Sequence, residues 1–219
     1  MSRKIIASLV CCLLLVSSTA SGQINLFENR NFAGWQFHAP DEGVAVGDVF
    51  TFTQDGRLVA TGLPYSYLLT RETFKNFIFS LEWRWIDEPT NSGIFIKATE
   101  LPADCFLPKS VEVQLRHTDA GDLWAFHGRE IADTDGRLHT VPESAIGRYM
   151  GVRKLRGAEL TPGQWNKMEI ISIDRTLVIT VNGMIVNWTS GAEAIEGYIG
   201  FQSEGSPIEF RNAVVTRLP

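Results

Sequence analysis

The sequence contains few of the residues that stabilise a chain by covalent or metal cross-links. It has three cysteines and four histidines in 219 residues. Cys11 and Cys12 lie in an apolar N-terminal stretch, so a chain cleaved beyond them would keep only Cys105. A single thiol cannot form an internal disulfide. The stability of the mature protein must therefore come from its core, for which thirteen Phe, six Trp and four Tyr provide the aromatic area.

The sequence also lacks an excess of positive charge and the common catalytic motifs. Its formal net charge is −5, whereas nucleic-acid-binding domains present a basic face and a pI above about 9. No His-x-x-x-His, Cys-x-x-Cys, serine-centred elbow or phosphate-binding loop occurs. These absences argue against a nucleic-acid partner and against zinc, nucleotide and serine-hydrolase chemistry. With 44% hydrophobic and 21% charged residues, the chain is not intrinsically disordered either.

The N-terminal apolar run is short. Residues 5–16 are apolar or small, follow the basic pair Arg3 and Lys4, and precede the small residues 17–22. A bilayer-spanning helix needs about 20 apolar residues. A charged start, a short apolar stretch and a small-residue region are typical of a secretory signal peptide. The protein is therefore predicted to be secreted or periplasmic, with no membrane contact after the leader is removed.

Cleavage is expected after Gly22, with Ala20 as the alternative position. Residues 1–22 would then be the signal peptide and residues 23–219 a single domain, because no repeat or Pro/Ser-rich linker divides them. A lipid anchor at Cys11 or Cys12 is the competing interpretation. More apolar residues follow both cysteines, which argues against it.

Short strands dominate the rest of the pattern. The clearest is Phe77–Trp85, in which apolar and polar residues alternate, as expected when successive side chains point to opposite faces of a sheet. About a dozen such segments with turns between them predict an all-β antiparallel sandwich or jelly roll. Gly128–Leu160 is poor in strand signal, and either a long functional loop or a short helix is expected there. The other predicted strands are 49–53, 58–61, 67–70, 93–97, 111–117, 166–173, 177–181, 184–188, 198–202 and 208–215.

Two predicted strands carry polar residues on one face. Glu82 and Arg84 share a face of one strand, and Glu112, Gln114 and Arg116 share a face of another. If these strands neighbour each other, two carboxylates, a guanidinium and an amide converge. Lys97, two residues after Phe95, would join them from the strand between. The alternative is an ordinary half-exposed sheet stabilised by cross-strand ion pairs.

Three further groups of residues have a functional and a structural interpretation. Trp124 could stack on a sugar ring or belong to the core. His127 is placed for an exposed site, and His117 could face the core. Asp119 and Asp122 could bind calcium or serve as turn residues.

Six short motifs occur along the chain in an order that is specific to one protein family. The chain resembles the 3-keto-disaccharide hydrolase domain family, a bacterial family with a concanavalin-A-like jelly-roll fold, over residues 25–219. The residues that carry the resemblance are Asn-Leu-Phe-Glu-Asn-Arg-Asn-Phe-Ala-Gly-Trp (25–35), Leu-Glu-Trp-Arg through Asn-Ser-Gly-Ile-Phe-Ile-Lys (81–97), Val-Glu-Val-Gln-Leu (111–115), Gly-Gln-Trp-Asn (163–166), Val-Asn-Gly (181–183) and Ile-Gly-Phe-Gln-Ser-Glu-Gly-Ser-Pro-Ile-Glu-Phe-Arg-Asn (199–212).

The resemblance implies a hydrolase that cleaves glycosides already oxidised to a ketone at sugar carbon 3. Such a ketone acidifies the hydrogen on carbon 2. A base removes this hydrogen, the glycosidic bond at carbon 1 is eliminated, and water then adds. The partner implied is an oxidised di- or oligosaccharide. No cofactor is expected, although a divalent metal is compatible with the resemblance.

The same resemblance suggests roles for individual residues. Glu112 is expected to be the base and Glu82 the acid or second carboxylate. Arg84 and Lys97 would stabilise the enediolate. The substrate-binding residues expected are Gln114 and Gln202 for hydroxyl groups, Trp124 for stacking, His127 and Glu204. Glu204 stands where the family pattern has histidine, and His127 could compensate for that change.

Two other functions fit the sequence. The first is a non-catalytic carbohydrate-binding jelly roll, which needs only aromatic and hydrogen-bonding groups on an open face. The second is a structural envelope domain, in which Glu and Arg pair on the surface. A location of Glu82 and Glu112 on opposite sheets would favour the binding module.

Overall fold

The computed structural model describes residues 22–99, 105, 107–132, 135–142, 144 and 147–219. The predicted signal peptide therefore lies outside the described residues, apart from Gly22. The described residues form sixteen strands and one short helix, α2 (Val46–Val49). The all-β prediction is confirmed. In this part of the chain, no helix is both long and apolar enough to cross a membrane.

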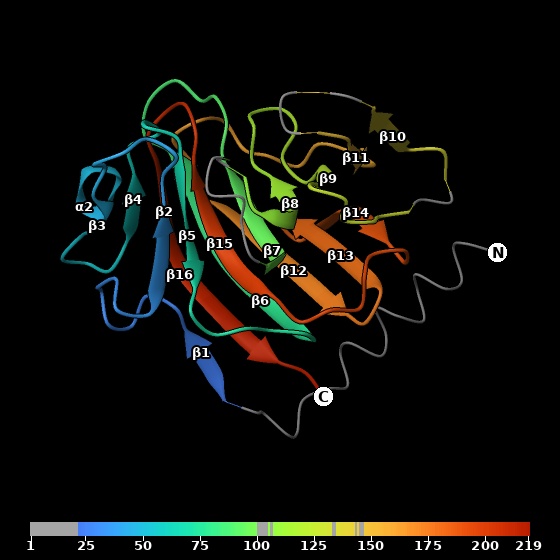
Figure 1. Ribbon diagram of the computed structural model, residues 1–219, viewed down its shortest axis with the longest axis horizontal. Helices are drawn as coiled ribbons and strands as arrows, with labels where there is room; N and C mark the ends of the chain where they lie inside the picture. The colour runs from blue at the N-terminus through green and yellow to red at the C-terminus, as the bar shows by residue number, and fades with distance from the viewer. Residues whose placement is uncertain (1–21, 100–104, 106, 133–134, 143, 145–146) are drawn as a thin grey trace.

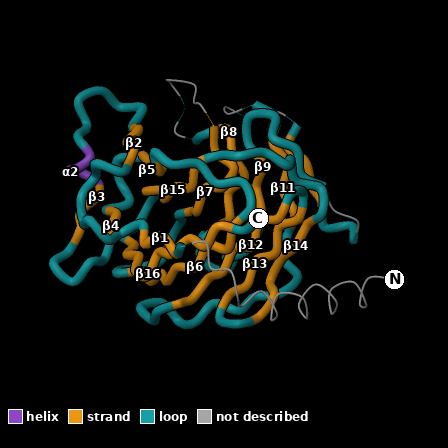
Figure 2. Tube along the Cα trace, turned by 90° about the horizontal axis from the view of Figure 1, so that it is seen from below, coloured by secondary structure: helices purple, strands orange, loops and turns teal. Residues whose placement is uncertain are grey.

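The strands form two antiparallel sheets that pack face to face (Figures 1 and 2). In the first, here called the back sheet, β1 pairs with β16 outside the main strand order. The back sheet runs in the order β14 (Met184–Thr189), β13 (Thr176–Val181), β12 (Asn166–Ile173), β6 (Phe77–Trp85), β16 (Ile208–Arg217), β4 (Leu58–Ala60) and β3 (Phe50–Phe52), with β1 spanning Gln23–Asn25.

The second sheet, here called the front sheet, has eight strands. Its central strands come from distant parts of the sequence, because the late strand β15 lies between β5 and β7. The front sheet runs in the order β10 (Leu138–Val141), β11 (Tyr149–Val152), β9 (Leu123–Ala125), β8 (Lys109–Gln114), β7 (Gly93–Thr99), β15 (Tyr198–Ser203), β5 (Ser66–Thr70) and β2 (Trp35–His38).

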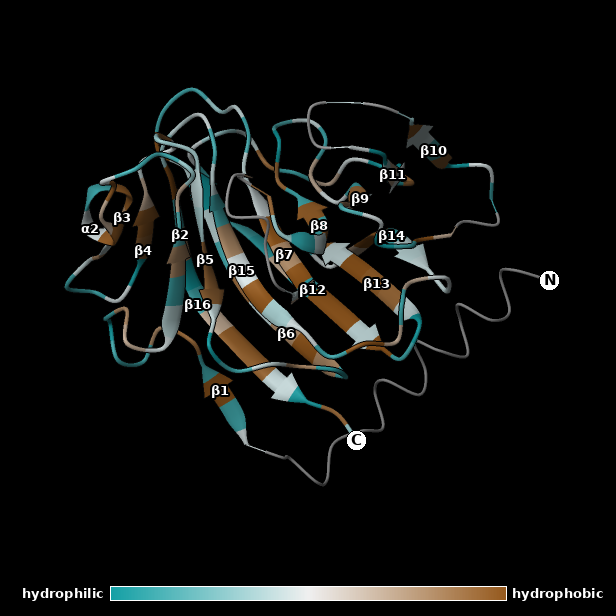
Figure 3. Ribbon diagram, viewed as in Figure 1, coloured by the Kyte–Doolittle hydropathy of each residue, from teal (hydrophilic) through white to brown (hydrophobic). Residues whose placement is uncertain are grey.

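The main core lies between the sheets. In β6, the alternation seen in the sequence is confirmed, because every second residue from Phe77 to Trp85 is at most 1% exposed. Phe201 of β15 meets this layer, with ring centroids 6.1 Å from Phe79 and 4.9 Å from Phe210. Figure 3 shows the apolar residues concentrated along the strands and the polar residues mainly in the loops. Full burial of each such side chain contributes roughly 1.5–3 kcal/mol.

A smaller apolar cluster covers the outer face of the front sheet. It includes Tyr67, Leu69, Phe95 and Phe126, with Trp124 packed against it. Alternate residues of β7 and β8 point the opposite way, into the main core. The outer face of the front sheet is therefore partly covered, which provides the sheltered surface on which the site described below is built.

The structure differs from the strand prediction in several places of the front sheet, where β2 and β9 are strands that the sequence did not predict. The stretch 128–160 contains β10 and β11, where a long loop or a short helix was expected. Strand β8 ends at Gln114, whereas the predicted strand continued to His117. The side-chain Oε1 of Gln114 accepts hydrogen bonds from the backbone N–H groups of Leu115 (2.9 Å) and Arg116 (2.7 Å). Arg116 and His117 consequently belong to a turn, not to the strand.

Candidate active site

A cavity of about 230 Å³ lies on the outer face of the front sheet and is here called the site cavity. Five of the residues predicted to catalyse the reaction or bind substrate line it: Glu112, Gln114, Trp124, Gln202 and Glu204. They come from β8, β9, β15 and the segment after β15. The other lining residues are Asn91, Leu107, Arg116, Asp119, Phe126 and Tyr149.

Glu112 is the most buried ionisable group of this cavity, with 2% of its surface exposed. In β7, Phe95 pairs with Glu112, and Gly93 lies two residues earlier on the same face. A Cβ atom built on Gly93 would lie 2.0 Å from Oε1 of Glu112. The glycine thus provides the space that the carboxyl group occupies. Among the residues that the structure describes, no donor reaches Oε1 of Glu112. Burial, and then the negative charge of Glu204, raise the pKa of Glu112 well above its usual value.

Glu204 is, besides Asp119, another carboxyl group of the cavity. It follows β15 and is held beside Asn91 by an isolated antiparallel bridge between the two residues. Burial raises the pKa of Glu204, while the amides of Asn91 and Gln202 and the charge of Arg116 act in the opposite direction. The ionised form of Glu204 thus has polar support that the ionised form of Glu112 lacks. Of the two groups, Glu204 ionises more readily.

The raised pKa of Glu112 predicts a pH-dependent effect on stability. Above the usual carboxyl pKa of 4.5, the folded protein retains a proton that the unfolded chain has released, so a rise in pH opposes folding. The neutral variant Glu112→Gln should unfold at the same denaturant concentration as wild type near pH 4. It should become progressively more stable than wild type towards pH 8. Urea unfolding at pH 4, 6 and 8 measures this difference.

Glu82→Gln is the matched control for that experiment. Burial raises the pKa of Glu82, but hydrogen bonds from Asn212 and Arg211 and nearby positive charge outweigh it, so the pKa is lowered. This carboxylate stabilises the fold once it is ionised, and the contribution is lost as the pH falls through the lowered pKa. Glu82→Gln should therefore be less stable than wild type at pH 8. Equal pH dependence in the two variants would contradict the environment assigned to Glu112.

Two amide side chains, those of Gln114 and Gln202, also line the cavity. Gln202 is 1% exposed, and within the described part of the chain neither its Nε2 nor its Oε1 makes a hydrogen bond of ordinary geometry. The amide nevertheless lies close enough to Glu204 to lower the pKa of that carboxyl group. Buried polar groups normally have partners. Gln114 uses its Oε1 on the backbone, which leaves its Nε2 for a ligand. Both amides are therefore suited to bind hydroxyl or carbonyl groups of a ligand.

Trp124 and Tyr149 form an aromatic wall of the cavity. Their ring centroids are 5.5 Å apart, and Trp124 also contacts His139 at 4.6 Å. Trp124 is half-buried, so it both packs on the sheet and lines the cavity. His127 lies next to the cavity without lining it. Its Nε2 is 3.1 Å from the carbonyl oxygen of Leu107 and 3.4 Å from Sγ of Cys105, an arrangement that holds the adjoining loop.

The prediction that Glu82 and Arg84 share a face with Glu112 is wrong. Both residues lie on β6 of the back sheet, with that sheet and the core between them and the site cavity. Glu82 accepts hydrogen bonds from the guanidinium group of Arg211 at 2.6 and 2.9 Å. Arg84 pairs with the buried Glu209 at 2.8 Å. These contacts are the cross-strand ion pairs that the sequence offered as the alternative.

Trp165 completes that surface network on the back sheet. The guanidinium carbons of Arg84 and Arg211 lie 4.7 and 4.0 Å from its ring centroid. Cation–π contacts of this kind contribute about 0.5–1 kcal/mol when exposed. The polar face of β6 therefore has a structural role.

The expectation that Lys97 joins the site is also wrong. A bulge follows Ile96 in β7, and Lys97 has a φ of 50°, so its side chain leaves the outer face at this point. Its Nζ donates to the carbonyl oxygens of Asp174 (3.3 Å) and Ile195 (3.5 Å). Burial and the charge of Arg129 lower the pKa of Lys97 to about 8. The lysine joins two loops away from the cavity.

The sequence did not indicate Asn91 or Tyr149 as parts of the site. Asn91 lies before β7, and its bridge to Glu204 brings it to the cavity. Tyr149 belongs to β11, in the stretch without a strand pattern. Among the described residues, no group of three or more His, Cys, Asp or Glu side chains is arranged to hold a metal ion. A calcium site at Asp119 and Asp122 stays a prediction. In the structure, Asp122 accepts a hydrogen bond from the backbone N–H of Lys154, and Asp119 forms an ion pair with the Nζ of Lys154.

Comparisons with known proteins place the chain in a family. A curated 3-keto-disaccharide hydrolase from Bacteroides thetaiotaomicron is 25% identical over 240 residues, which cover 88% of this chain and 77% of that protein. A solved structure of a candidate glycosyl hydrolase from Parabacteroides distasonis has a TM-score of 0.64 at 20% identity, covering 90% of this chain and 94% of that one. The carbohydrate-binding module CBM66 from Bacillus subtilis has a TM-score of 0.57 at 11% identity, covering 84% and 95%.

The two structural likenesses show the jelly-roll fold. The family model described as the 3-keto-alpha-glucoside-1,2-lyase-like domain matches residues 22–216, nearly the whole chain. The chain belongs to the 3-keto-alpha-glucoside-1,2-lyase-like family.

Proposed function

We propose that the protein cleaves glycosides whose sugar ring carries a ketone at carbon 3. The observation that carries this proposal is the pair Glu112 and Glu204, two carboxyl groups with raised pKa values in one sheltered cavity. Membership of the family and the name of the relative from Bacteroides thetaiotaomicron support the substrate class. Carboxyl groups with shifted pKa values are characteristic of acid–base sites.

The difference between the two environments assigns their roles in this proposal. Glu204 ionises first and removes the hydrogen on carbon 2, which the neighbouring ketone has acidified. Glu112 retains its proton and donates it to the glycosidic oxygen on carbon 1 as that bond breaks. This exchanges the roles first expected for Glu112, which was the base in the sequence-based hypothesis.

The second half of the reaction restores both groups. Water adds its oxygen to carbon 1 and loses a proton to Glu112, while Glu204 returns its proton to carbon 2. The sum of elimination and hydration is hydrolysis of the glycosidic bond. The amide Nε2 of Gln202 and the nearby charge of Arg116 would stabilise the enediolate oxygen in place of Arg84 and Lys97.

The proposal needs a partner reaction and a location. A ketone at carbon 3 arises by oxidation of a sugar hydroxyl group, so a separate oxidising enzyme must supply the substrate. The hydrolysis itself consumes no redox cofactor. The basic and apolar start of the chain supports a secreted or periplasmic location for the enzyme.

A carbohydrate-binding module is the second candidate. The location of Glu82 and Glu112 on opposite sheets favours it, and a binding module shares the fold. Glu204 favours the enzyme over the binding module, because it supplies a second carboxyl group on the same face as Glu112. A binding surface needs no such pair, and burying two carboxyl groups together opposes folding.

Turnover of a panel of 3-keto-disaccharides and their unoxidised parents tests the proposal. We expect cleavage of the keto compounds only, with the same rate before and after treatment with a chelator. A loss of rate with chelator would add a metal to the reaction. Saturable binding of an unoxidised glycan, without cleavage of any member of the panel, would instead establish the binding module.

A further inference from the structure

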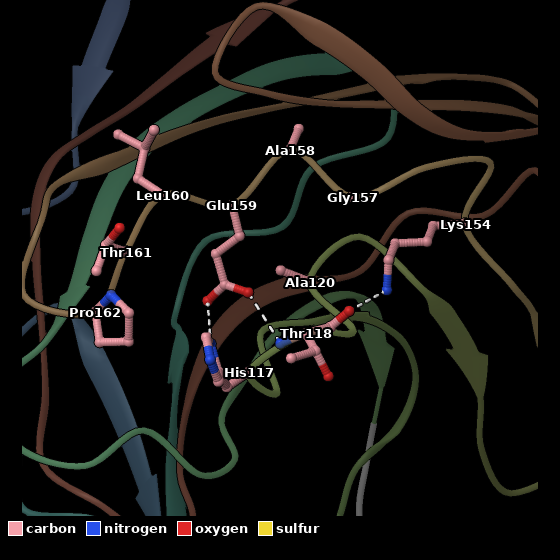
Figure 4. A pocket seen from close by; sticks show the side chains of 10 residues that line it. All are labelled: His117, Thr118, Ala120, Lys154, Gly157, Ala158, Glu159, Leu160, Thr161 and Pro162. Atoms are coloured by element: carbon pink, nitrogen blue, oxygen red, sulfur yellow. Dashed lines mark hydrogen bonds and ion pairs between the residues drawn. The ribbon is translucent and has the colours of Figure 1, made fainter.

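A second cavity lies beside the site cavity and is here called the rim cavity. Its volume is about 480 Å³. One wall is the turn after β8, which contributes His117, Thr118 and Ala120, and the other is the loop that follows β11. Figure 4 shows Glu159 reaching from that loop towards His117 and Thr118. The loop contributes Lys154, Gly157, Ala158, Glu159, Leu160, Thr161 and Pro162.

The same turn separates the two cavities. Arg116 and Asp119 line the site cavity, whereas their neighbours His117, Thr118 and Ala120 line the rim cavity. An ion pair joins Arg116 to Asp119 at 3.8 Å, and Lys154 of the rim cavity reaches Asp119 at 3.5 Å. A ligand that extends from the carboxyl pair over this turn would therefore enter the rim cavity.

The separating turn is held in a strained conformation. Thr118 has a φ of 73°, which is unfavourable for a β-branched residue. Two contacts from the opposite wall hold it there: Glu159 accepts a hydrogen bond from its backbone N–H at 3.0 Å, and Lys154 donates to its carbonyl oxygen. Strained backbone of this kind occurs preferentially at ligand clamps and functional sites.

The chemistry of the rim cavity matches an uncharged, hydroxylated ring. Its charged side chains already have partners, because Glu159 accepts a hydrogen bond from the backbone N–H of Thr118 and lies 3.2 Å from Nδ1 of His117, and Lys154 pairs with Asp119. A charged ligand would have to break one of these pairs. Paired charges still offer donors and acceptors to hydroxyl groups, and Leu160 and Pro162 add apolar surface. Sites that combine apolar lining with a few polar groups are typical for small ligands.

Size points to the same conclusion. Ligand pockets usually measure about 300–1,000 Å³, so the site cavity alone is small for a disaccharide, while the rim cavity falls within the range. We propose that the rim cavity binds the second sugar ring of the substrate, the one that leaves when the glycosidic bond breaks. This inference rests on the proposed function and extends it to a substrate of at least two rings.

Gly157 allows a direct test. It lines the rim cavity, and a Cβ atom at this position meets no atom within 4 Å, so a larger side chain adds bulk without a clash. We expect Gly157→Leu to lower kcat/KM for a 3-keto-disaccharide about tenfold or more, mainly through KM. Cleavage of methyl 3-keto-α-glucoside, whose leaving group is too small to reach the rim cavity, should stay within about twofold of wild type.

Gly34→Leu is the matched control, because Gly34 also has open space around it and lies in the segment before β2. It should leave both substrates unaffected. If Gly157→Leu changes neither substrate, or both equally, the second-ring site is refuted while the proposed function stands. If wild type cleaves neither substrate, the proposed function itself fails. The methyl glucoside also reports whether each variant is correctly folded.

Discussion

Glu112→Gln and Glu204→Gln are each expected to lower kcat for a 3-keto-disaccharide by about 10²–10⁴-fold, the usual contribution of one proton-transfer group. Both substitutions keep the shape of the side chain and remove its ability to exchange a proton. Neither residue holds the back sheet or the main core together, since both line the site cavity on the outer face of the front sheet. The loss should therefore appear in turnover with the folded state retained.

Glu82→Gln provides the matched comparison. It makes the same chemical change on the opposite side of the molecule, where Glu82 pairs with Arg211. Its kcat should remain within about twofold of wild type, whereas a loss as large as that of Glu112→Gln would contradict the site. Most of the activity surviving in both Glu112→Gln and Glu204→Gln would refute the acid–base pair.

The pH dependence of kcat/KM then separates the two roles. If Glu204 is the base, activity falls at low pH as Glu204 becomes protonated; if Glu112 is the acid, activity falls at high pH as Glu112 loses its proton. The residual activity of Glu204→Gln should lack the low-pH limb, and that of Glu112→Gln the high-pH limb. The reverse pattern would restore Glu112 as the base. Because the two groups interact, the measured values belong to the pair.

Gly93→Ala is expected to lower kcat about 10²-fold without a large change in stability. The new methyl group would lie 2.0 Å from Oε1, 2.6 Å from Cδ and 2.7 Å from Cγ of Glu112, so the side chain of Glu112 must move. A displacement of about 1 Å in a reacting group can cost a factor of this size. Gly93 has an ordinary backbone conformation that alanine can adopt. Turnover and thermal unfolding of the same preparation measure the two effects.

The double variant Gly93→Ala/Glu112→Gln identifies the cause. If Gly93→Ala acts only by moving Glu112, the double variant should be as inactive as Glu112→Gln alone, since no carboxyl group remains to be misplaced. Losses that multiply would show that Gly93→Ala damages the cavity in another way. Unchanged turnover in Gly93→Ala would show that the position of Glu112 is unimportant for the reaction.

The sequence predicted the strands well where one face of a strand is buried. Phe77–Trp85 and Asn166–Ile173 have the boundaries expected from their alternation, and the Asn182-Gly183 turn forms with both residues at positive φ. In such strands, apolar and polar residues alternate because successive side chains are alternately buried and exposed. β10 was not predicted, because its residues, Leu138–Val141, are only half-buried or exposed and therefore show no alternation of apolar and polar residues.

The sequence predicted only some of the residues that line the site, because it does not reveal the order of the strands in the sheets. Alternation showed correctly that Glu112 and Gln114 share a face, and likewise Glu82 and Arg84. It carries no information about which sheet a strand joins. β6 and β8 belong to different sheets, so the two faces never meet. The bulge that redirects Lys97 leaves no pattern in the sequence either.

The position of β15 and β16 has a consequence for the order of folding. Each of these C-terminal strands fills the middle of a sheet: β15 separates β5 from β7, and β16 separates β6 from β4. A nascent chain that has not yet reached Tyr198 therefore presents unpaired strand edges in both layers, a state prone to non-native pairing. Glu204 and Gln202 arrive with β15, so the carboxyl pair is completed only when the last strands close both sheets.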